Sequence, residues 1–241
     1  MPTGYGDDLA YIHDVGFGFH ARGVAPGLLG ILRDTGVTHG LVVDLGCGSG
    51  IWAQKLVEAG YRVRGIDRSA AMLRIARQRC PEATFQRASF VDVRLPPCDA
   101  VTAVGEIFNF LFEAGNRRDT LTHLFARVSE ALRPGGVFVF DVAEPGRGGG
   151  PGRRQRNFHG DDWAILLETE EADGILTRRM TTFRRIGRRY RRGAEVHRLR
   201  LLRAAELARE LRRLGFRVRV QRRYGDYTLP RGWAAIVARK P

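Results

Sequence analysis

The sequence predicts an α/β fold, a doubly wound and mostly parallel seven-stranded sheet with a small antiparallel β insertion after its fifth strand. Apolar runs of strand length alternate with helical patterns through residues 1–145, as they do in βαβ units. A glycine-rich stretch at residues 146–152 ends that alternation. The three strand-like runs that follow are joined by short connections, which form antiparallel hairpins rather than crossovers.

The individual elements follow from the spacing of the apolar residues. A first helix is expected at 26–34, with Pro26 in its first turn. The first five core strands are expected at 41–45, 61–66, 84–87, 100–105 and 137–142, with helices at 50–59, 69–78 and 117–132. The insertion strands are expected at 162–171, 175–186 and 189–202, and a helix at 203–214 with strands at 216–221 and 233–238 completes the sheet.

These elements divide the chain into three parts. Residues 1–147 form the expected ligand-binding core, including an N-terminal lid segment. Residues 148–202 form the insertion, which is expected to cap the functional site. Residues 203–241 return to the core with a helix and the last two strands.

The net charge of +14 comes from the second half of the chain. Residues 1–150 hold 16 basic and 16 acidic side chains, whereas residues 151–241 hold 24 basic and 10 acidic ones. Such a half is typical of proteins that bind nucleic acid, a phosphorylated substrate or an acidic carrier. However, 38 of the 40 basic residues are Arg, a bias that a GC-rich coding sequence produces without any function. We therefore prefer a solvated arginine-rich surface and keep nucleic acid as the less favoured partner.

Membrane, secreted and metal-binding classes are not favoured. No segment approaches the roughly 18 uncharged apolar residues of a membrane span, and residues 1–8 lack the basic and apolar regions of a secretory signal. Cys47, Cys80 and Cys98 show neither metal-ligand spacing nor an even disulfide framework. We expect a cytoplasmic protein without a metal site. The sequence sets no oligomeric state, and a homodimer is one option.

A glycine-rich loop carries the main functional signal. A strand that runs into Asp44-Leu45-Gly46-Cys47-Gly48-Ser49-Gly50 and then a helix predicts a ligand site at the carboxyl end of the sheet. Glycines allow positive φ and close approach of a ligand, and the helix N-terminus offers free N–H groups. The dinucleotide fingerprint does not fit, because the third glycine comes one position early and Ile51 takes its place. Asp44 would also repel a pyrophosphate and attract a cationic ligand.

The loop resembles the first motif of the class I S-adenosylmethionine-dependent methyltransferases, whose fold is Rossmann-like, and the resemblance continues through residues 37–145. It implies an enzyme with S-adenosylmethionine as its cofactor. It also implies that Asp44 helps to hold the methionine amine and that the loop packs on the ligand at Gly46, Cys47, Gly48 and Gly50.

Asp67, 23 residues after Asp44, ends the second expected strand. One carboxylate there can accept hydrogen bonds from both ribose hydroxyls. The resemblance implies the same role, with Arg68 and Met72 beside the adenine. The alternative is that Asp67 only caps the next helix. Ser89 stands, before Phe90, where the family often has an acidic residue near the adenine amine, and this departure weakens the assignment of both residues.

Two candidate catalytic groups lie near the ends of expected strands. Glu106, in Gly105-Glu106-Ile107-Phe108, resembles the fourth motif of small-molecule enzymes of the family, close to the sulfonium and the acceptor. Glu195 and His197 alternate along the third insertion strand, so they share one face. His197 is the favoured general base if that face covers the site, whereas on a solvent face the pair is a surface hydrogen bond.

The N-terminal segment supplies the remaining candidates. Residues 11–22 are rich in aromatic residues and glycine, and in the family such a segment closes over the cofactor. We expect His13 to be a further catalytic candidate there, and Tyr11 and Arg22 to contact the methionine carboxylate. The alternative is an ordinary packed N-terminal arm.

The favoured activity is methyl transfer to a small-molecule acceptor through an O, N or C nucleophile. A short N-terminus and an inserted cap favour it over an RNA methyltransferase that would bind phosphates with the arginine-rich half. Gly105-Glu106-Ile107-Phe108 also differs from the Asn-Pro-Pro-Tyr type used on base nitrogens. A third alternative is a non-catalytic module that only binds the cofactor.

Overall fold

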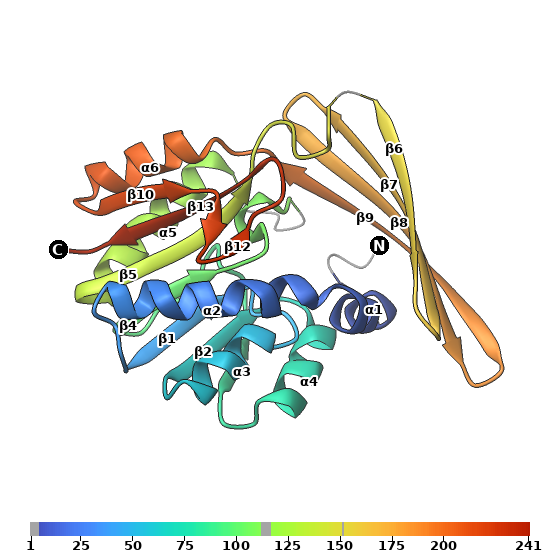
Figure 1. Ribbon diagram of the computed structural model, residues 1–241, viewed down its shortest axis with the longest axis horizontal. Coiled ribbons are helices and arrows are strands. Elements are labelled where there is room, and N and C mark those ends of the chain that lie inside the picture. The colour runs from blue at the N-terminus through green and yellow to red at the C-terminus, as the bar shows by residue number, and fades with distance from the viewer. Residues whose placement is uncertain (1–4, 112–116, 151) are drawn as a thin grey trace.

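The computed structural model describes residues 5–111, 117–150 and 152–241, and its core is an α/β sandwich (Figure 1). The seven core strands lie in the order β10-β13-β5-β4-β1-β2-β3. Their bounds are β1 Leu41–Leu45, β2 Arg62–Asp67, β3 Thr84–Arg87, β4 Cys98–Ala103, β5 Leu132–Ala143, β10 Arg217–Gln221 and β13 Trp233–Arg239. The pairs among β1 to β5 are parallel, and β13 is antiparallel to both β5 and β10. This topology confirms the predicted fold class.

Helices cover both faces of the sheet. Their bounds are α1 Asp7–Phe17, α2 Phe19–Asp34, α3 Ile51–Glu58, α4 Ala70–Arg79, α5 Arg118–Ala131 and α6 Ala204–Arg213. Apolar side chains of α2 and α3 pack with one face of the central strands, and those of α5 and α6 pack with the other. Within the described residues, no single helix is long and apolar enough to cross a membrane, although α1 and α2 together, bent by 60° at their junction, meet the same criterion.

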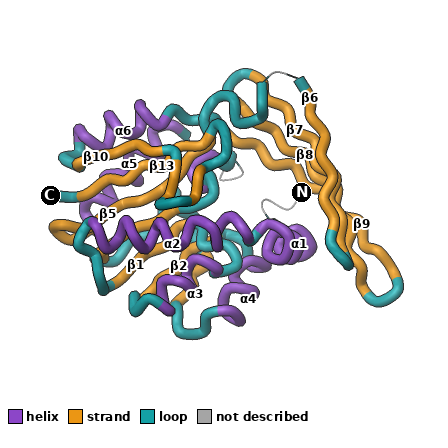
Figure 2. The backbone as a smooth tube through the Cα atoms, in the orientation of Figure 1, coloured by secondary structure: helices purple, strands orange, loops and turns teal. Residues whose placement is uncertain are grey.

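A second sheet forms a cap beside the core (Figure 2). Its four antiparallel strands lie in the order β6-β7-β8-β9. Their bounds are β6 Arg153–His159, β7 Trp163–Ala172, β8 Ile175–Ile186 and β9 Arg189–Arg200. The sequence predicts only the last three, because β6 lacks alternating apolar residues: apart from Phe158 its side chains are polar and nearly all are exposed.

The cap leaves and re-enters the core at one point. The backbone N–H of Leu202 donates to the carbonyl oxygen of Ala143 at 2.9 Å. The buried amide of Asn109, in the short helix η1 (Ile107–Asn109), closes this neck. It donates to the carbonyl oxygens of Ala143 at 2.9 Å and Arg200 at 2.6 Å, and it accepts from the N–H of Ala143 at 3.0 Å. One side chain therefore joins both ends of the insertion.

Helix α1 lies between the core and the cap (Figure 1). On the core side, Asp14 forms an ion pair with Arg79 of α4 at 2.8 Å. On the cap side, Asp8 pairs with Arg184 of β8 and Arg191 of β9. The first turns of the chain thus tie the two sheets together.

The predicted first helix begins too late. Helix α2 starts at Phe19, so Pro26 lies inside it rather than in its first turn. The glycines of this segment obscured the helical pattern, but two of them serve packing. Gly23 and Gly27 lie against Tyr227 and Tyr224 of a small hairpin, β11 (Arg223–Tyr224) and β12 (Tyr227–Thr228), that the sequence pattern did not predict.

Substituting Gly27 tests this close packing. A Cβ at Gly27 would lie 2.2 Å from the backbone of Tyr224, so Gly27→Ala is expected to lower the free energy of unfolding by about 1–3 kcal/mol. Gly30, in the same helix, has no atom within 4 Å of such a Cβ. Gly30→Ala should therefore raise stability by about 0.5–1 kcal/mol. Urea unfolding measures both, and equal effects would contradict the packing.

Candidate active site

The glycine loop after β1 is held by the end of β2. The backbone N–H groups of Gly46 and Cys47 both donate to the carbonyl oxygen of Ile66, at 2.7 and 3.0 Å. Gly48 has φ +53°, and its N–H donates to Asp67 Oδ2 at 2.9 Å. A Cβ at Gly48 would meet no atom within 4 Å, so this side of the loop is open. Gly50, also left-handed, leads into α3.

Asp44 places a buried carboxyl group under the loop. Its residue is 3% exposed, and Oδ1 accepts from the hydroxyl of Thr102 on β4 at 2.7 Å. Burial raises the pKa of Asp44 to about 7, although the Thr102 bond opposes the shift. A cation beside Asp44 would favour the ionised form. The carboxyl group is therefore suited to a positively charged ligand.

Asp67 lies on the neighbouring strand and faces the same loop. Besides the Gly48 bond, its Oδ1 accepts from the N–H of Ser69 at 2.8 Å. Burial raises the pKa of Asp67. The cap of α4 is Ser69, whose hydroxyl accepts from the N–H of Met72 at 3.1 Å. The alternative that Asp67 is only a helix cap is therefore wrong, because Ser69 has that role.

These groups fit S-adenosylmethionine. An amino group and a sulfonium need acidic neighbours, which Asp44 offers, and a ribose needs two acceptor oxygens, which Asp67 offers. The open face of Gly48, whose N–H is bonded to Asp67, leaves room beside that carboxyl group.

The other predicted cofactor residues have different surroundings. Cys47 is buried behind the loop, and Met72 packs with Ala10 and Ala71. The Phe90 ring packs in the core, 5.3 Å from Phe108, so the structure gives it a packing role. The Ser89 hydroxyl accepts a hydrogen bond from the N–H of Val91. The backbone carbonyl oxygen of Arg68 accepts one from the Arg87 guanidinium.

Tyr11 and Arg22, the two residues expected to contact the methionine carboxylate, lie in different parts of the structure. The hydroxyl of Tyr11 donates to Asp162 at 2.8 Å, and the Arg184 guanidinium lies 3.7 Å from the centre of its ring. Tyr11 thus belongs to the contact between α1 and the cap. Arg22 lies beside Gly18, which in turn approaches Ile51 at the start of α3, so Arg22 is near the glycine loop.

Glu106 follows β4 with a left-handed backbone, at φ 62°. Its side chain is 3% exposed and accepts from two arginines. Arg147 Nε donates to Oε1 at 2.8 Å, and Arg178 Nη2 on β8 donates to Oε2 at 2.7 Å. Burial alone would raise the pKa of Glu106, but the two arginines hold it below its ordinary value. Glu106 is therefore an anchored anion and a poor proton acceptor.

Asp141 on β5 fixes the backbone that presents Glu106. Its Oδ1 accepts from the N–H groups of Gly105 and Glu106, at 2.9 and 2.8 Å, and its Oδ2 accepts from the hydroxyl of Tyr224 at 3.2 Å. Asp141 is fully buried, and burial raises its pKa to about 7. No sequence pattern predicts this role for Asp141, because its partners are distant in the chain.

The inner face of the cap brings Glu195 and His197 to this region. They share that face with Arg178, because His197 is paired with Arg178 across β8 and β9. His197 is 3% exposed, and its Nε2 lies 3.0 Å from Glu195 Oε2. Glu195 Oε1 accepts from the N–H of Gly6 at 2.9 Å. The pair faces the core, so the surface alternative for it is wrong.

Aromatic and imidazole rings surround His197. The ring of Tyr5 lies 5.0 Å from that of His197 and 5.2 Å from that of His13.

His20 has different neighbours. Its ring lies 4.6 Å from that of Trp233, and its Nδ1 is 3.1 Å from the hydroxyl of Tyr227. Burial lowers the pKa of His13 and of His20 to about 4, so both are neutral at neutral pH. The buried atoms His13 Nδ1 and His20 Nε2 have no hydrogen-bond partner among the described residues.

Sequence reasoning therefore missed several residues of the site. They are Tyr5, Asp141, Arg147, Arg178, Tyr227 and Trp233. Arg178 could have been found from the alternation of its strand. Every second residue of a strand shares one face, and Arg178 lies on the face that is turned toward the core. The others share no local motif.

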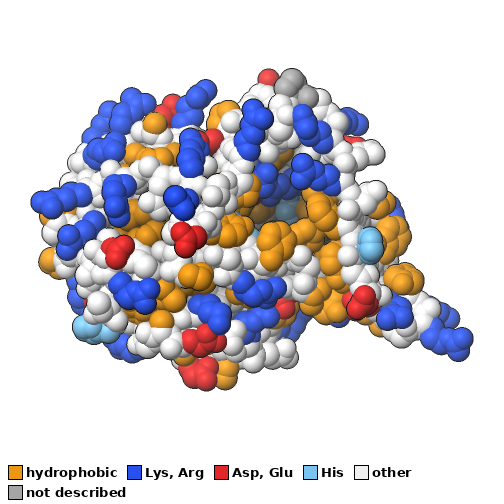
Figure 3. Space-filling view, in the orientation of Figure 1, with side chains coloured by type: hydrophobic (Ala, Val, Ile, Leu, Met, Phe, Trp, Pro, Cys, Tyr) orange, Lys and Arg blue, Asp and Glu red, His pale blue; other side chains and the backbone are white. Residues whose placement is uncertain are grey.

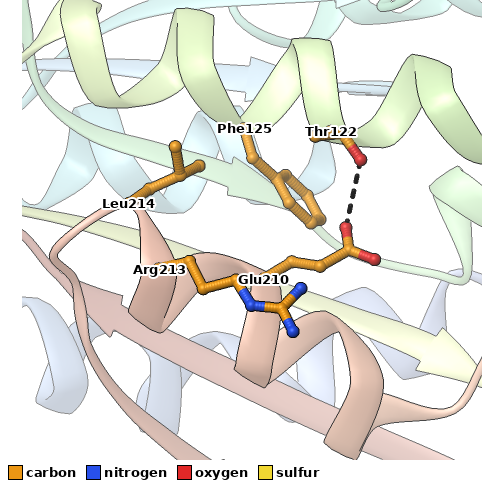
Figure 4. Close-up of a pocket in the computed structure, with 5 residues that line it drawn as sticks. All are labelled: Thr122, Phe125, Glu210, Arg213 and Leu214. Carbon is orange, nitrogen blue, oxygen red and sulfur yellow. Dashed lines mark hydrogen bonds between the residues drawn. The ribbon is translucent and has the colours of Figure 1, made fainter.

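Two surface depressions lie near these elements. One of about 410 Å³ is lined by residues 144–146, Arg222 and residues 229–233, and it therefore borders Trp233. The other, of about 210 Å³, lies between α5 and α6, where the Thr122 hydroxyl donates to Glu210 at 3.2 Å (Figure 4). The second depression borders none of the site residues.

Residues 42–136 match the family model described as a methyltransferase domain. Over 132 residues the chain is 32% identical to the ubiquinone biosynthesis O-methyltransferase of Methylobacterium sp. (strain 4-46), a match that covers 54% of this chain and 49% of that protein. The chain thus spans about half the length of this curated relative.

Two solved structures share the fold over nearly the whole chain. An S-adenosylmethionine-dependent methyltransferase from Clostridium acetobutylicum ATCC 824 has a TM-score of 0.81 at 18% identity, covering 96% of this chain and 97% of that one. The sugar N-methyltransferase KedS8 from Streptoalloteichus sp. ATCC 53650 has a TM-score of 0.76 at 20% identity, covering 98% and 96%.

Replacing Asp141 tests its hold on the backbone before Glu106. Asp141→Ala leaves two buried N–H groups without an acceptor and should cost about 2–5 kcal/mol of unfolding free energy. Asp141→Asn keeps one acceptor oxygen and should cost less. Tyr224→Phe removes a single bond and should cost about 1 kcal/mol. Thermal unfolding compares the three, and a harmless Asp141→Ala would contradict this role.

Proposed function

We propose that this chain, whose residues 42–136 match a methyltransferase-domain family model, is a class I S-adenosylmethionine-dependent methyltransferase that transfers a methyl group to a small-molecule acceptor. One observation carries the proposal: the buried carboxyl group of Asp44 and the half-buried one of Asp67 lie at the ends of neighbouring parallel strands, beside one left-handed glycine loop. The O-methyltransferase and sugar N-methyltransferase names of the relatives support a small acceptor and leave the acceptor atom open.

When bound, the cofactor supplies a methyl group on a cationic sulfur. We propose that Asp44 faces its positive end, Asp67 accepts from its ribose hydroxyls, and the loop around Gly48 lies against it. Arg22 is suited to its carboxylate because a guanidinium can bind a carboxylate through two N–H groups. The cap excludes water from the far side.

Within the site, His197 is the best-placed proton acceptor. Glu195 orients its imidazole, as a carboxylate does for a catalytic histidine. When bound, S-adenosylmethionine would supply the methyl group to the acceptor's lone pair and would leave as S-adenosylhomocysteine, while His197 would take the acceptor's proton. His13 is a weak base because of its low pKa. The charge of the Glu106 carboxylate is compensated by two arginines, which makes it a poor proton acceptor. We therefore assign both residues to positioning.

Binding of the cofactor provides the first test. Isothermal titration should detect both S-adenosylmethionine and S-adenosylhomocysteine, and failure of both to bind would end the proposal. Since the pKa of Asp44 is about 7 in the free chain, binding of an ammonium group below pH 7 must release its proton. Affinity should therefore rise by roughly tenfold from pH 6 to pH 8 and then level off.

Buffers of different ionisation enthalpy measure that proton directly. Asp44→Asn should abolish the release. 5′-Methylthioadenosine, which lacks the amino and carboxylate groups, is the matched ligand and should bind without it. Proton release by this ligand as well would show that Asp44 is not its source.

Replacing His197 tests the base. On the best acceptor from a panel of small amines and alcohols, His197→Asn should lower kcat about 10²–10⁴-fold. Binding of S-adenosylhomocysteine should change little. His159→Asn is the control, because His159 is an exposed cap histidine on β6. Turnover by His197→Asn equal to that of the control would remove His197 as the base.

A further inference from the structure

Arg147 and Arg178 bring more positive charge to one place than the structure neutralises there. Both guanidinium groups converge on the single carboxylate of Glu106, so the cluster carries a net charge of +1. Their side chains are only 26% and 17% exposed. An excess charge that is largely withdrawn from water is costly unless a counterion compensates it.

We infer that Arg147 and Arg178 bind an anionic group, a carboxylate or a phosphate, of the acceptor substrate. This inference rests on the proposed function and deepens it, because it states which small molecules the site accepts. Such an acceptor has a nucleophilic nitrogen or oxygen at one end and an anion at the other.

Both arginines retain donors for a ligand. A guanidinium has five N–H groups, and each arginine uses one of them on Glu106. A cation–π contact also holds Arg147 in place, because its guanidinium lies 5.1 Å from the centre of the Trp233 ring. Two oriented guanidinium groups with remaining N–H donors match the paired oxygens of a carboxylate or phosphate.

The other titratable groups near the pair are neutral or already bonded elsewhere. The neighbouring His13 and His20 are neutral, and each has a buried ring nitrogen without a partner among the described residues. Two acids of the cap lie nearby: Glu195 accepts from Gly6 and is bonded to His197, and Glu171 accepts from the N–H groups of Gly146 and Gly148, which flank Arg147. The imidazoles can therefore bond to the neutral part of the acceptor while the arginines take its charge.

The location fits the acceptor better than the cofactor. Glu106 follows β4, and Arg178 lies on the inner face of the cap, so the pair is between core and cap. Figure 3 shows a hollow between these two parts, with Lys or Arg and His side chains within it and hydrophobic side chains on its walls. Arg22, the candidate for the cofactor's carboxylate, is instead on α2 near the start of α3.

Matched acceptor pairs test the inference. Transfer of labelled methyl is measured to amines and alcohols supplied with and without a carboxylate or phosphate, such as glucosamine and glucosamine 6-phosphate. The wild-type chain should prefer the anionic members. Arg178→Met and Arg147→Met should raise KM about 10–100-fold more for those members than for the uncharged members, the effect of losing charge-assisted hydrogen bonds to the anion.

Arg179→Met is the matched control. Arg179 is the next residue on β8, points to the opposite face and pairs with Glu168 and Glu170. It should keep the wild-type preference. A wild-type chain with no preference for anionic acceptors, or an equal loss in Arg179→Met, would overturn the inference.

A second measurement separates the acceptor from the cofactor and needs no turnover. S-adenosylhomocysteine should bind equally well to Arg178→Met and to the wild type, whereas a selective loss would show that the arginines hold the cofactor carboxylate. Inorganic phosphate and acetate should bind to the chain loaded with S-adenosylhomocysteine and not to Arg178→Met. If Arg178→Met is unstable because Glu106 loses a partner, the Arg147→Met, Arg178→Met, Glu106→Gln triple variant removes the two cations together with the buried carboxylate and is used for the same titration. Failure of S-adenosylhomocysteine to bind the wild type would instead contradict the proposed function itself.

Discussion

The buried carboxylate of Glu106 is the constraint on which the arrangement of this site depends. A carboxylate that is 3% exposed requires compensating charge, and its two guanidinium partners come from different parts of the chain. Arg147 belongs to the connection after β5, and Arg178 belongs to the cap. Asp141 fixes the backbone that presents the carboxylate. One charge at the end of β4 therefore relates the core sheet, the connection and the cap to one another.

Helix α1 repeats this principle at the other side of the cap. Its aspartates pair with arginines of α4, β8 and β9, and the residue before it donates a backbone N–H to Glu195. Some arginines of the second half of the chain, among them Arg178, Arg184 and Arg191, are thus paired with carboxylates of the core and of α1.

The parts of the site that the sequence predicts are those encoded by neighbouring residues. The glycine loop and Asp44 are contiguous, and Asp67 follows at the end of the next strand, so periodicity and turn chemistry suffice. The alternation of Glu195 and His197 likewise placed them on one face, but only the packing of the cap shows that this face is the inner one. Tyr5, Asp141 and Arg147 come from the segment before α1, from β5 and from the connection after β5, and no local pattern relates them. The glycines of α2 had the opposite effect, because they concealed the start of a helix. They lie where the helix contacts a hairpin about 200 residues away in the chain.

The neck at Asn109 has a consequence for how such a chain can change. Both ends of the cap meet at one amide side chain, so the intervening 50 or so residues form a closed excursion whose length does not alter the register of the core sheet. The glycine loop and its carboxyl groups lie wholly outside that excursion. On the proposed function, the cap residues Arg178 and His197 that face the acceptor therefore belong to a different stretch of sequence from the loop and carboxyl groups that hold S-adenosylmethionine.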